Sequence, residues 1–133
     1  MKNSILIFIA LIGLTACSGS TTDVAVGNKT TIEIEPFYNA GEVLKGEKIE
    51  AKFHLKNTGD YPLMVASISG SCTCTVVEEP DGPINPGETF ELTAVVDTEK
   101  TGAGEISKGV TILANTEPHQ SVVLVKATVL QNK

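Results

Sequence analysis

Apolar and polar residues alternate along most of this chain, in short runs that are separated by turn residues. The clearest run covers residues 49–56, and its apolar face is formed by Ile49, Ala51, Phe53 and Leu55. Similar runs cover residues 90–97, 110–114 and 123–129. A period of two is typical of strands that bury one face, so each run predicts such a strand.

Shorter runs at residues 32–35, 63–68 and 72–77 bring the total to about seven strands. Turn residues separate the runs, as at Asn57-Thr58-Gly59-Asp60. No helical period intervenes, which argues against parallel crossover units. The pattern therefore predicts an all-β fold, an Ig-like antiparallel β-sandwich. The chain has no tryptophan, so it lacks the core tryptophan of antibody domains.

The first 17 residues follow a different pattern, that of an export signal. A short positive head, Met1-Lys2-Asn3, precedes a continuous apolar stretch from Ile5 to Leu14. This stretch is shorter than the roughly 20 residues that a permanent membrane span needs. Leu14-Thr15-Ala16-Cys17 resembles the bacterial lipobox, which implies cleavage before Cys17 and acylation of its thiol.

This interpretation divides the chain into three parts. We expect a lipoprotein signal peptide at residues 1–16 and an acylated cysteine with a flexible tether at residues 17–30. The β-sandwich domain is expected at residues 31–133. More than one acyl chain gives stable anchoring, so the partner at this end of the chain is the membrane.

Charge and composition exclude several kinds of partner. The net charge is −6 and aromatic residues make up 5% of the chain, which argues against nucleic acid. The same charge argues against electrostatic docking to anionic lipid. Neither a glycine-rich phosphate loop nor a calcium-loop spacing occurs, so no cofactor is expected.

Cys72 and Cys74 form the chemically distinctive cluster, and three interpretations stay open. They are packed or inertly bridged residues, a redox-active disulfide, or a soft metal site. In an extended strand, both sulfurs and Val76 would share one face. A bridge would need a kinked backbone, because α carbons two residues apart in a flat strand lie near the disulfide limit. A copper or zinc site would need further ligands, and the candidates are His54, His119 and Met64.

The last two predicted strands also carry apolar residues on their outer faces. If the odd-numbered residues from 123 to 129 face the core, Val122 and Leu124 face outward. Leu113 lies on the outer face of the preceding strand by the same logic. If the two strands pair as a hairpin, these three residues form one patch. A contiguous exposed patch indicates a docking surface, here for a protein partner of the cell envelope.

Several segments together resemble a known family. In order along the chain they are Phe53-His54-Leu55-Lys56-Asn57-Thr58-Gly59-Asp60, Pro62-Leu63, Ser71-Cys72-Thr73-Cys74-Thr75 and Ile84-Asn85-Pro86-Gly87-Glu88. From about Ile34 to Val129 the chain is similar to the domain of unknown function 1573 family. The resemblance implies a secreted or lipid-anchored Ig-like domain, frequent in Bacteroidota, with no established activity. Thr73 replaces the glycine that usually separates the two cysteines.

These observations predict a lipid-anchored protein of the cell envelope. The segment after Cys17 lacks the acid-rich signal of many surface lipoproteins of that phylum, which favours the periplasmic face of the outer membrane. Two histidines and no glycine-flanked serine argue against an enzyme, so we expect a non-enzymatic binding or structural module. The alternative is a thiol-based redox or metal-handling module, for copper or zinc, that uses Cys72 and Cys74.

Overall fold

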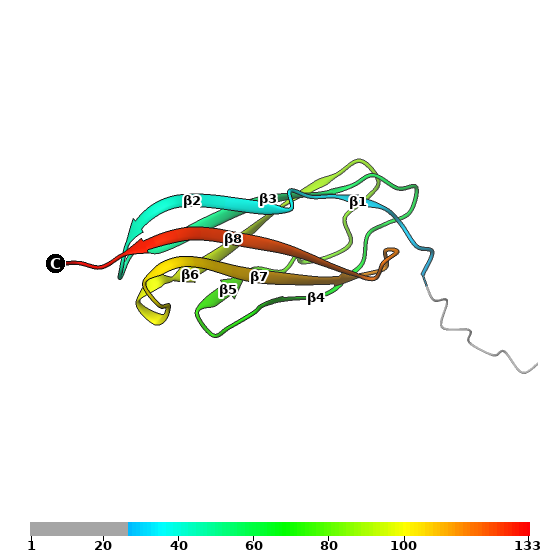
Figure 1. Ribbon diagram of the computed structural model, residues 1–133. Helices are drawn as coiled ribbons and strands as arrows, with labels where there is room; N and C mark the ends of the chain where they lie inside the picture. Colours follow the sequence, from blue (N-terminus) through cyan, green and yellow to red (C-terminus); the bar gives the residue numbers. More distant parts are fainter. Residues whose placement is uncertain (1–26) are drawn as a thin grey trace, which may run out of the picture.

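The computed structural model describes residues 27–133, which form two four-stranded β-sheets packed face to face (Figure 1). The first sheet contains, in spatial order, β1 (Ile32–Glu33), β3 (Lys48–Asn57), β6 (Thr89–Asp97) and β5 (Thr75–Val77). The second contains β2 (Phe37–Leu44), β8 (Gln120–Leu130), β7 (Gly104–Ala114) and β4 (Val65–Gly70). A 3-10 helix, η1 (Thr98–Lys100), joins β6 to β7.

The predicted signal peptide, Cys17 and residues 18–26 of the predicted tether lie outside the described residues. Within residues 27–133, no helix is long and apolar enough to cross a bilayer. Thr30 is only 4% exposed and bridges to Thr116. The folded domain therefore already includes Thr30, which the prediction had assigned to the tether.

The core lies between the two sheets, and the period-two runs supply it. Every second residue of β3 from Ile49 to Leu55 is buried, as is every second residue of β8 from Val123 to Val129. Phe53 is fully buried and meets Tyr38 of the facing sheet edge to face, with 6.4 Å between ring centroids. Burying a side chain of this size contributes about 1.5–3 kcal/mol, so these faces hold the sheets together.

The predicted Ig-like β-sandwich is confirmed, with one strand that the sequence pattern did not show. That strand is β2, whose register shifts between Asn39 and Glu42, so no clean alternation marks it. It runs parallel to β8, whereas every other strand pair is antiparallel. The second sheet is therefore mixed.

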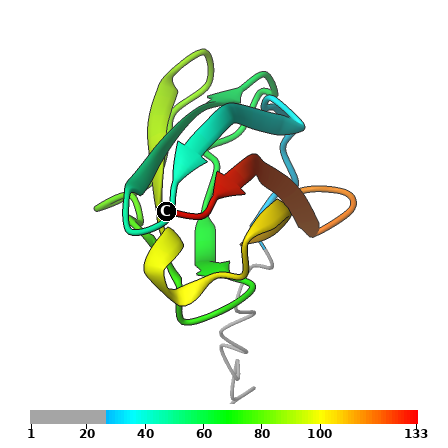
Figure 2. The ribbon, with the colours of Figure 1, turned by 60° about the vertical axis from the view of Figure 1, so that its left-hand side comes forward.

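The described chain starts at one end of the sandwich and finishes at the other (Figure 1). Figure 2 brings the C-terminal end forward. The turn between β4 and β5 belongs to this C-terminal half, because Thr75 pairs with Val96 near the end of β6. Thr30 and Asn57 lie at the opposite end, so the turn projects away from the point where the chain enters the fold.

Candidate functional site

The predicted apolar patch lies on the outer face of the second sheet. Val122 is 50% exposed, and Leu113 and Leu124 are half-buried. Val122 and Leu124 both lean over Gly109 of β7, since a β-carbon there would lie 3.6 Å from Val122 Cγ1 and 3.9 Å from Leu124 Cδ2. Leu113 follows two residues after Thr111, the cross-strand partner of Val122. The three predicted residues therefore share one surface.

The structure adds Phe37, which sequence reasoning missed. Phe37 begins β2, is 51% exposed and pairs with Leu124 across the strands. Lys126 Nζ lies 4.7 Å from the centroid of its ring, a cation–π contact that borders the patch. Because no alternation marked β2, only the β2–β8 pairing reveals this contribution. We call Phe37, Leu113, Val122 and Leu124 together the apolar face.

The surroundings of the apolar face are poor in charge. Its outward neighbours on β4 and β7 are small or hydroxylated: Ser67, Ser69, Gly109 and Thr111. Lys126 marks one border, and beyond it a hollow of about 640 Å³ is lined mainly by polar side chains, among them Asn39 and Glu105. The apolar face is thus an exposed apolar area whose strand neighbours carry little charge.

Cys72 and Cys74 are joined by a disulfide in the turn between β4 and β5. Their α carbons lie 5.2 Å apart, within the usual range for a bridge. The predicted strand over residues 72–77 is shorter, Thr75–Val77, so the extended arrangement in which both sulfurs and Val76 would share one face does not occur. The chain turns here because it crosses from one sheet to the other, and the alternation restarts at Thr75, which leaves Val76 67% exposed.

Backbone hydrogen bonds fix this turn on both sides. Ser71 N donates to Gly109 O at 2.8 Å, and Asp97 N donates to Cys74 O at 2.8 Å. Within the turn, Thr75 N donates to Cys72 O at 3.1 Å. The Thr75 hydroxyl lies 3.7 Å from Cys72 Sγ and 3.8 Å from Cys74 Sγ. The turn is thus attached to both sheets through its main chain.

The proposed additional metal ligands do not assemble around the cysteines. His54 lies on the outer face of β3, where its Nδ1 is 3.0 Å from Glu35 Oε1 and its backbone N–H donates to Glu35 Oε2 at 2.8 Å. The backbone bond, with the ring contact next, lowers the pKa of Glu35 below its ordinary value. His119 and Met64 are exposed. Residues 27–133 contain no group of three or more His, Cys, Asp or Glu side chains suited to a metal ion, so the metal interpretation is not favoured.

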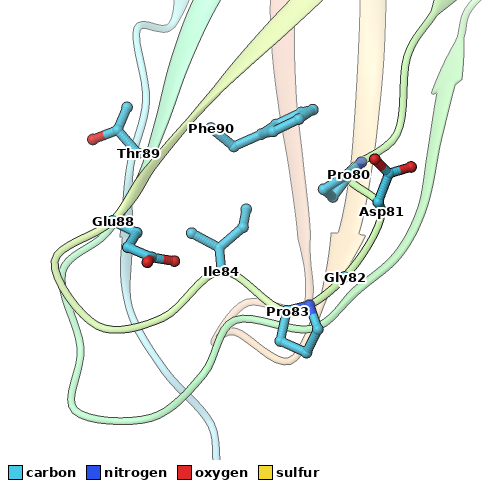
Figure 3. A pocket seen from close by; sticks show the side chains of 8 residues that line it. All are labelled: Pro80, Asp81, Gly82, Pro83, Ile84, Glu88, Thr89 and Phe90. Carbon is cyan, nitrogen blue, oxygen red and sulfur yellow. The ribbon is translucent and has the colours of Figure 1, made fainter.

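A further hollow, of about 400 Å³, lies beside the start of β6 (Figure 3). Prolines, Ile84 and Phe90 supply much of its lining, with the carboxylates of Asp81 and Glu88. Glu88 Oε2 accepts hydrogen bonds from Asn85 N at 2.9 Å and Asn85 Nδ2 at 3.2 Å, so it is engaged in holding the turn. The lining residues include no histidine, cysteine or lysine. We therefore do not place an active site here.

The strand order and the face-to-face packing of the two sheets define the class of protein, an Ig-like β-sandwich. Residues 32–129 match the family described as "Protein of unknown function (DUF1573)". The chain belongs to this family, as the sequence resemblance predicted. No curated protein sequence matches the chain.

Solved structures share the fold at low sequence identity. A protein of unknown function from Porphyromonas gingivalis W83 is 21% identical, with a TM-score of 0.67 over 82% of this chain and 51% of that one. This chain thus spans about half of that protein. The PapD-like domain 7 of human CEP192 is 13% identical, with a TM-score of 0.57 over 79% of this chain and 89% of that one. The secreted serine protease VesC from Vibrio cholerae is 9% identical, with a TM-score of 0.62 over 76% of this chain and 23% of that one. These likenesses concern the fold alone.

Proposed function

We propose that this chain is a lipid-anchored, non-enzymatic binding module of the cell envelope that docks a partner protein on its apolar face. The observation that carries the proposal is the gathering of Phe37 and Val122, each about half exposed, with Leu113 and Leu124 on adjacent strands. Covering such side chains removes apolar area from water, which is the main driving force of association. The lipobox-like Leu14-Thr15-Ala16-Cys17 supports the anchor.

The partner that we infer is a different protein, with an apolar contact surface and an acidic side chain placed opposite Lys126. Lys126 is the charged group that borders the apolar face, so a carboxylate would complement it. Two copies of this chain each carry a net charge of −6 and repel each other. Anionic lipid headgroups are repelled for the same reason, which leaves a heterologous protein as the favoured occupant.

Site-specific photo-cross-linking in intact cells tests this docking surface. We expect a photoreactive phenylalanine analogue at Val122 to give a discrete protein adduct, and the same analogue at Glu50, exposed on β3 of the other sheet, to give none. Leu124→Asp in the cross-linking chain should abolish the adduct. Because Leu124 is half-buried on the outer face, its substitution should change the free energy of unfolding by no more than about 1 kcal/mol.

A competition experiment separates a specific partner from chance contacts. Excess wild-type chain should suppress the Val122 adduct, while excess Leu124→Asp chain should not. Equal adducts from positions 122 and 50, or an adduct that consists of two copies of this chain, would overturn the proposed occupant. Adducts to lipid alone would do the same.

The proposed anchor is tested by Cys17→Ala. Because acylation needs the thiol of Cys17, we expect this variant to lose incorporation of labelled palmitate and to leave the detergent phase on phase partitioning. Wild-type chain should sediment with outer-membrane fragments and resist added protease until the outer membrane is opened. Unchanged partitioning of Cys17→Ala would contradict lipid anchoring while leaving the docking test unaffected.

A further inference from the structure

We propose that the Cys72–Cys74 disulfide is a thiol–disulfide exchange site that accepts two electrons from a dithiol, with Cys72 as the sulfur that is attacked. The bridge sits in the exposed turn between β4 and β5, in the half of the sandwich that projects away from the start of the described chain. This activity uses none of the residues of the apolar face.

The position of the bridge argues against a role as a structural staple. A disulfide stabilises mainly by restricting the unfolded chain, and the restriction grows with the length of the closed loop. Here the sequence separation is 2, so the closed loop is among the shortest possible. The main chain of the turn is held without the bridge, by the hydrogen bonds of Ser71 N to Gly109 O and of Asp97 N to Cys74 O. The fold therefore gains little stability from the bridge, and we expect the domain to stay folded when the bridge is reduced.

The two cysteines differ in exposure, and we infer the direction of attack from this difference. Cys74 is 4% exposed, whereas Cys72 is half-buried and precedes the exposed Thr73. An incoming thiolate reaches Cys72 more readily, and exchange rates depend on which sulfur can be reached. The Thr75 hydroxyl lies 3.7 Å from Cys72 Sγ and 3.8 Å from Cys74 Sγ, so it can donate a hydrogen bond to either thiolate, including Cys74 as it departs. A hydrogen bond to the charged form stabilises it.

The exchange balances without any further reactant. One thiolate of the dithiol attacks Cys72 Sγ, the Cys72–Cys74 bond breaks, and Cys74 leaves as a thiolate that takes up a proton. The second thiolate of the dithiol then attacks its own sulfur in the mixed disulfide and releases Cys72 as a thiolate, which is also protonated. The dithiol becomes a disulfide, and Cys72 and Cys74 become two thiols.

The first test measures reduction of the folded protein. We would use the full chain with Cys17→Ser, so that Cys72 and Cys74 are its only cysteines, and offer dithiothreitol or reduced, unfolded ribonuclease A. Alkylation and intact mass should show two new thiols without denaturant, and the thermal midpoint should fall by only a few degrees. If ribonuclease thiols are oxidised in proportion to the amount of chain that becomes reduced, the substrates are protein dithiols. If the chain reacts with dithiothreitol but not with ribonuclease, the substrates are small dithiols.

The second test uses a matched pair of variants. Cys74→Ser leaves the half-buried Cys72 thiol, and Cys72→Ser leaves the buried Cys74 thiol. We expect oxidised glutathione to modify Cys74→Ser at least about tenfold faster, because reactivity follows exposure of the thiol. Thr75→Val keeps the shape of the side chain but removes the hydroxyl, and should slow reduction of the bridge.

Three results would overturn the proposal. They are a bridge that is reduced only in denaturant, a reduced chain that is unfolded, and equal rates of modification of Cys74→Ser and Cys72→Ser by oxidised glutathione. None of them affects the cross-linking result for the apolar face, so failure here is distinguishable from failure of the proposed binding function.

Discussion

Replacing Asn57 by alanine is expected to destabilise the domain by about 3 kcal/mol or more, because it removes a fully buried amide and leaves its hydrogen-bond partners unpaired. Its Oδ1 accepts from Thr30 Oγ1 at 2.7 Å and from Gly59 N at 3.1 Å. Its Nδ2 donates to Tyr61 O at 2.8 Å and to Ile84 O at 2.9 Å. The amide thus ties the N-terminal segment, the turn after β3 and the loop before β6 together.

Thermal unfolding of the full chain measures this effect. For a domain of about 100 residues, 3 kcal/mol corresponds to a fall in Tm of roughly 12–24 °C. Asn39→Ala is the matched control, because Asn39 is exposed and its Oδ1 accepts one local hydrogen bond, from Gly41 N. The control should stay within about 0.5 kcal/mol of wild type. Asn57→Asp keeps both acceptor bonds but cannot make both donor bonds, so wild-type stability in this variant would contradict the assignment.

A methyl group at Gly70 is expected to cost about 2 kcal/mol, because the space beside it is already filled. Its β-carbon would lie 2.6 Å from Thr75 Cβ and 2.8 Å from Thr75 O. Neither atom belongs to the flexible end of a side chain, so the start of β5 must shift to relieve the overlap. Gly70 therefore permits the close approach of β4 and β5 that sets the Cys72–Cys74 turn.

The neighbouring strand offers the control for this prediction. Gly109 N donates a hydrogen bond to Ser71 Oγ in the same turn, and the nearest neighbour of a β-carbon at Gly109 would be Val122 Cγ1 at 3.6 Å, an ordinary contact. Gly109→Ala should therefore keep the free energy of unfolding within about 0.5 kcal/mol of wild type. Denaturant unfolding of both variants measures the difference, and equal stability of Gly70→Ala and Gly109→Ala would contradict the packing argument.

Two of the segments that carried the family resemblance, those that contain Asn57 and Glu88, now have a structural explanation. Asn57 N donates to Glu88 O at 3.0 Å, and Gly87 N donates to Asn57 O at 2.8 Å. These hydrogen bonds join the end of β3 to the turn that precedes β6. The side chain of Asn57 and the carboxylate of Glu88 stabilise this end of the sandwich. Asn57 and Glu88 therefore stabilise the fold. Another of the resembling segments, Ser71 to Thr75, contains the Cys72–Cys74 disulfide, and the apolar face lies outside all of them.

Part of the candidate site could be predicted from the sequence. Outward positions such as Val122 and Leu124 follow from the alternation of their own strand, which places the odd-numbered neighbours in the core. The contribution of Phe37 could not be predicted, because the register shift in β2 interrupts the alternation. Its place beside Leu124 depends on a pairing between residues 87 positions apart.

Alternation along the chain is enough to predict which faces of the regular strands are buried, and hence the fold class. It is a local property, because each side chain's polarity decides whether its exposure to water is favourable. Three features could be seen only in the folded chain: the parallel pairing of β2 with β8, the meeting of Cys72 and Cys74 in a turn, and the burial of the Asn57 amide. The physical reason is the same in each case. These features depend on which distant segments pack together, and alternation within one strand does not specify its partner.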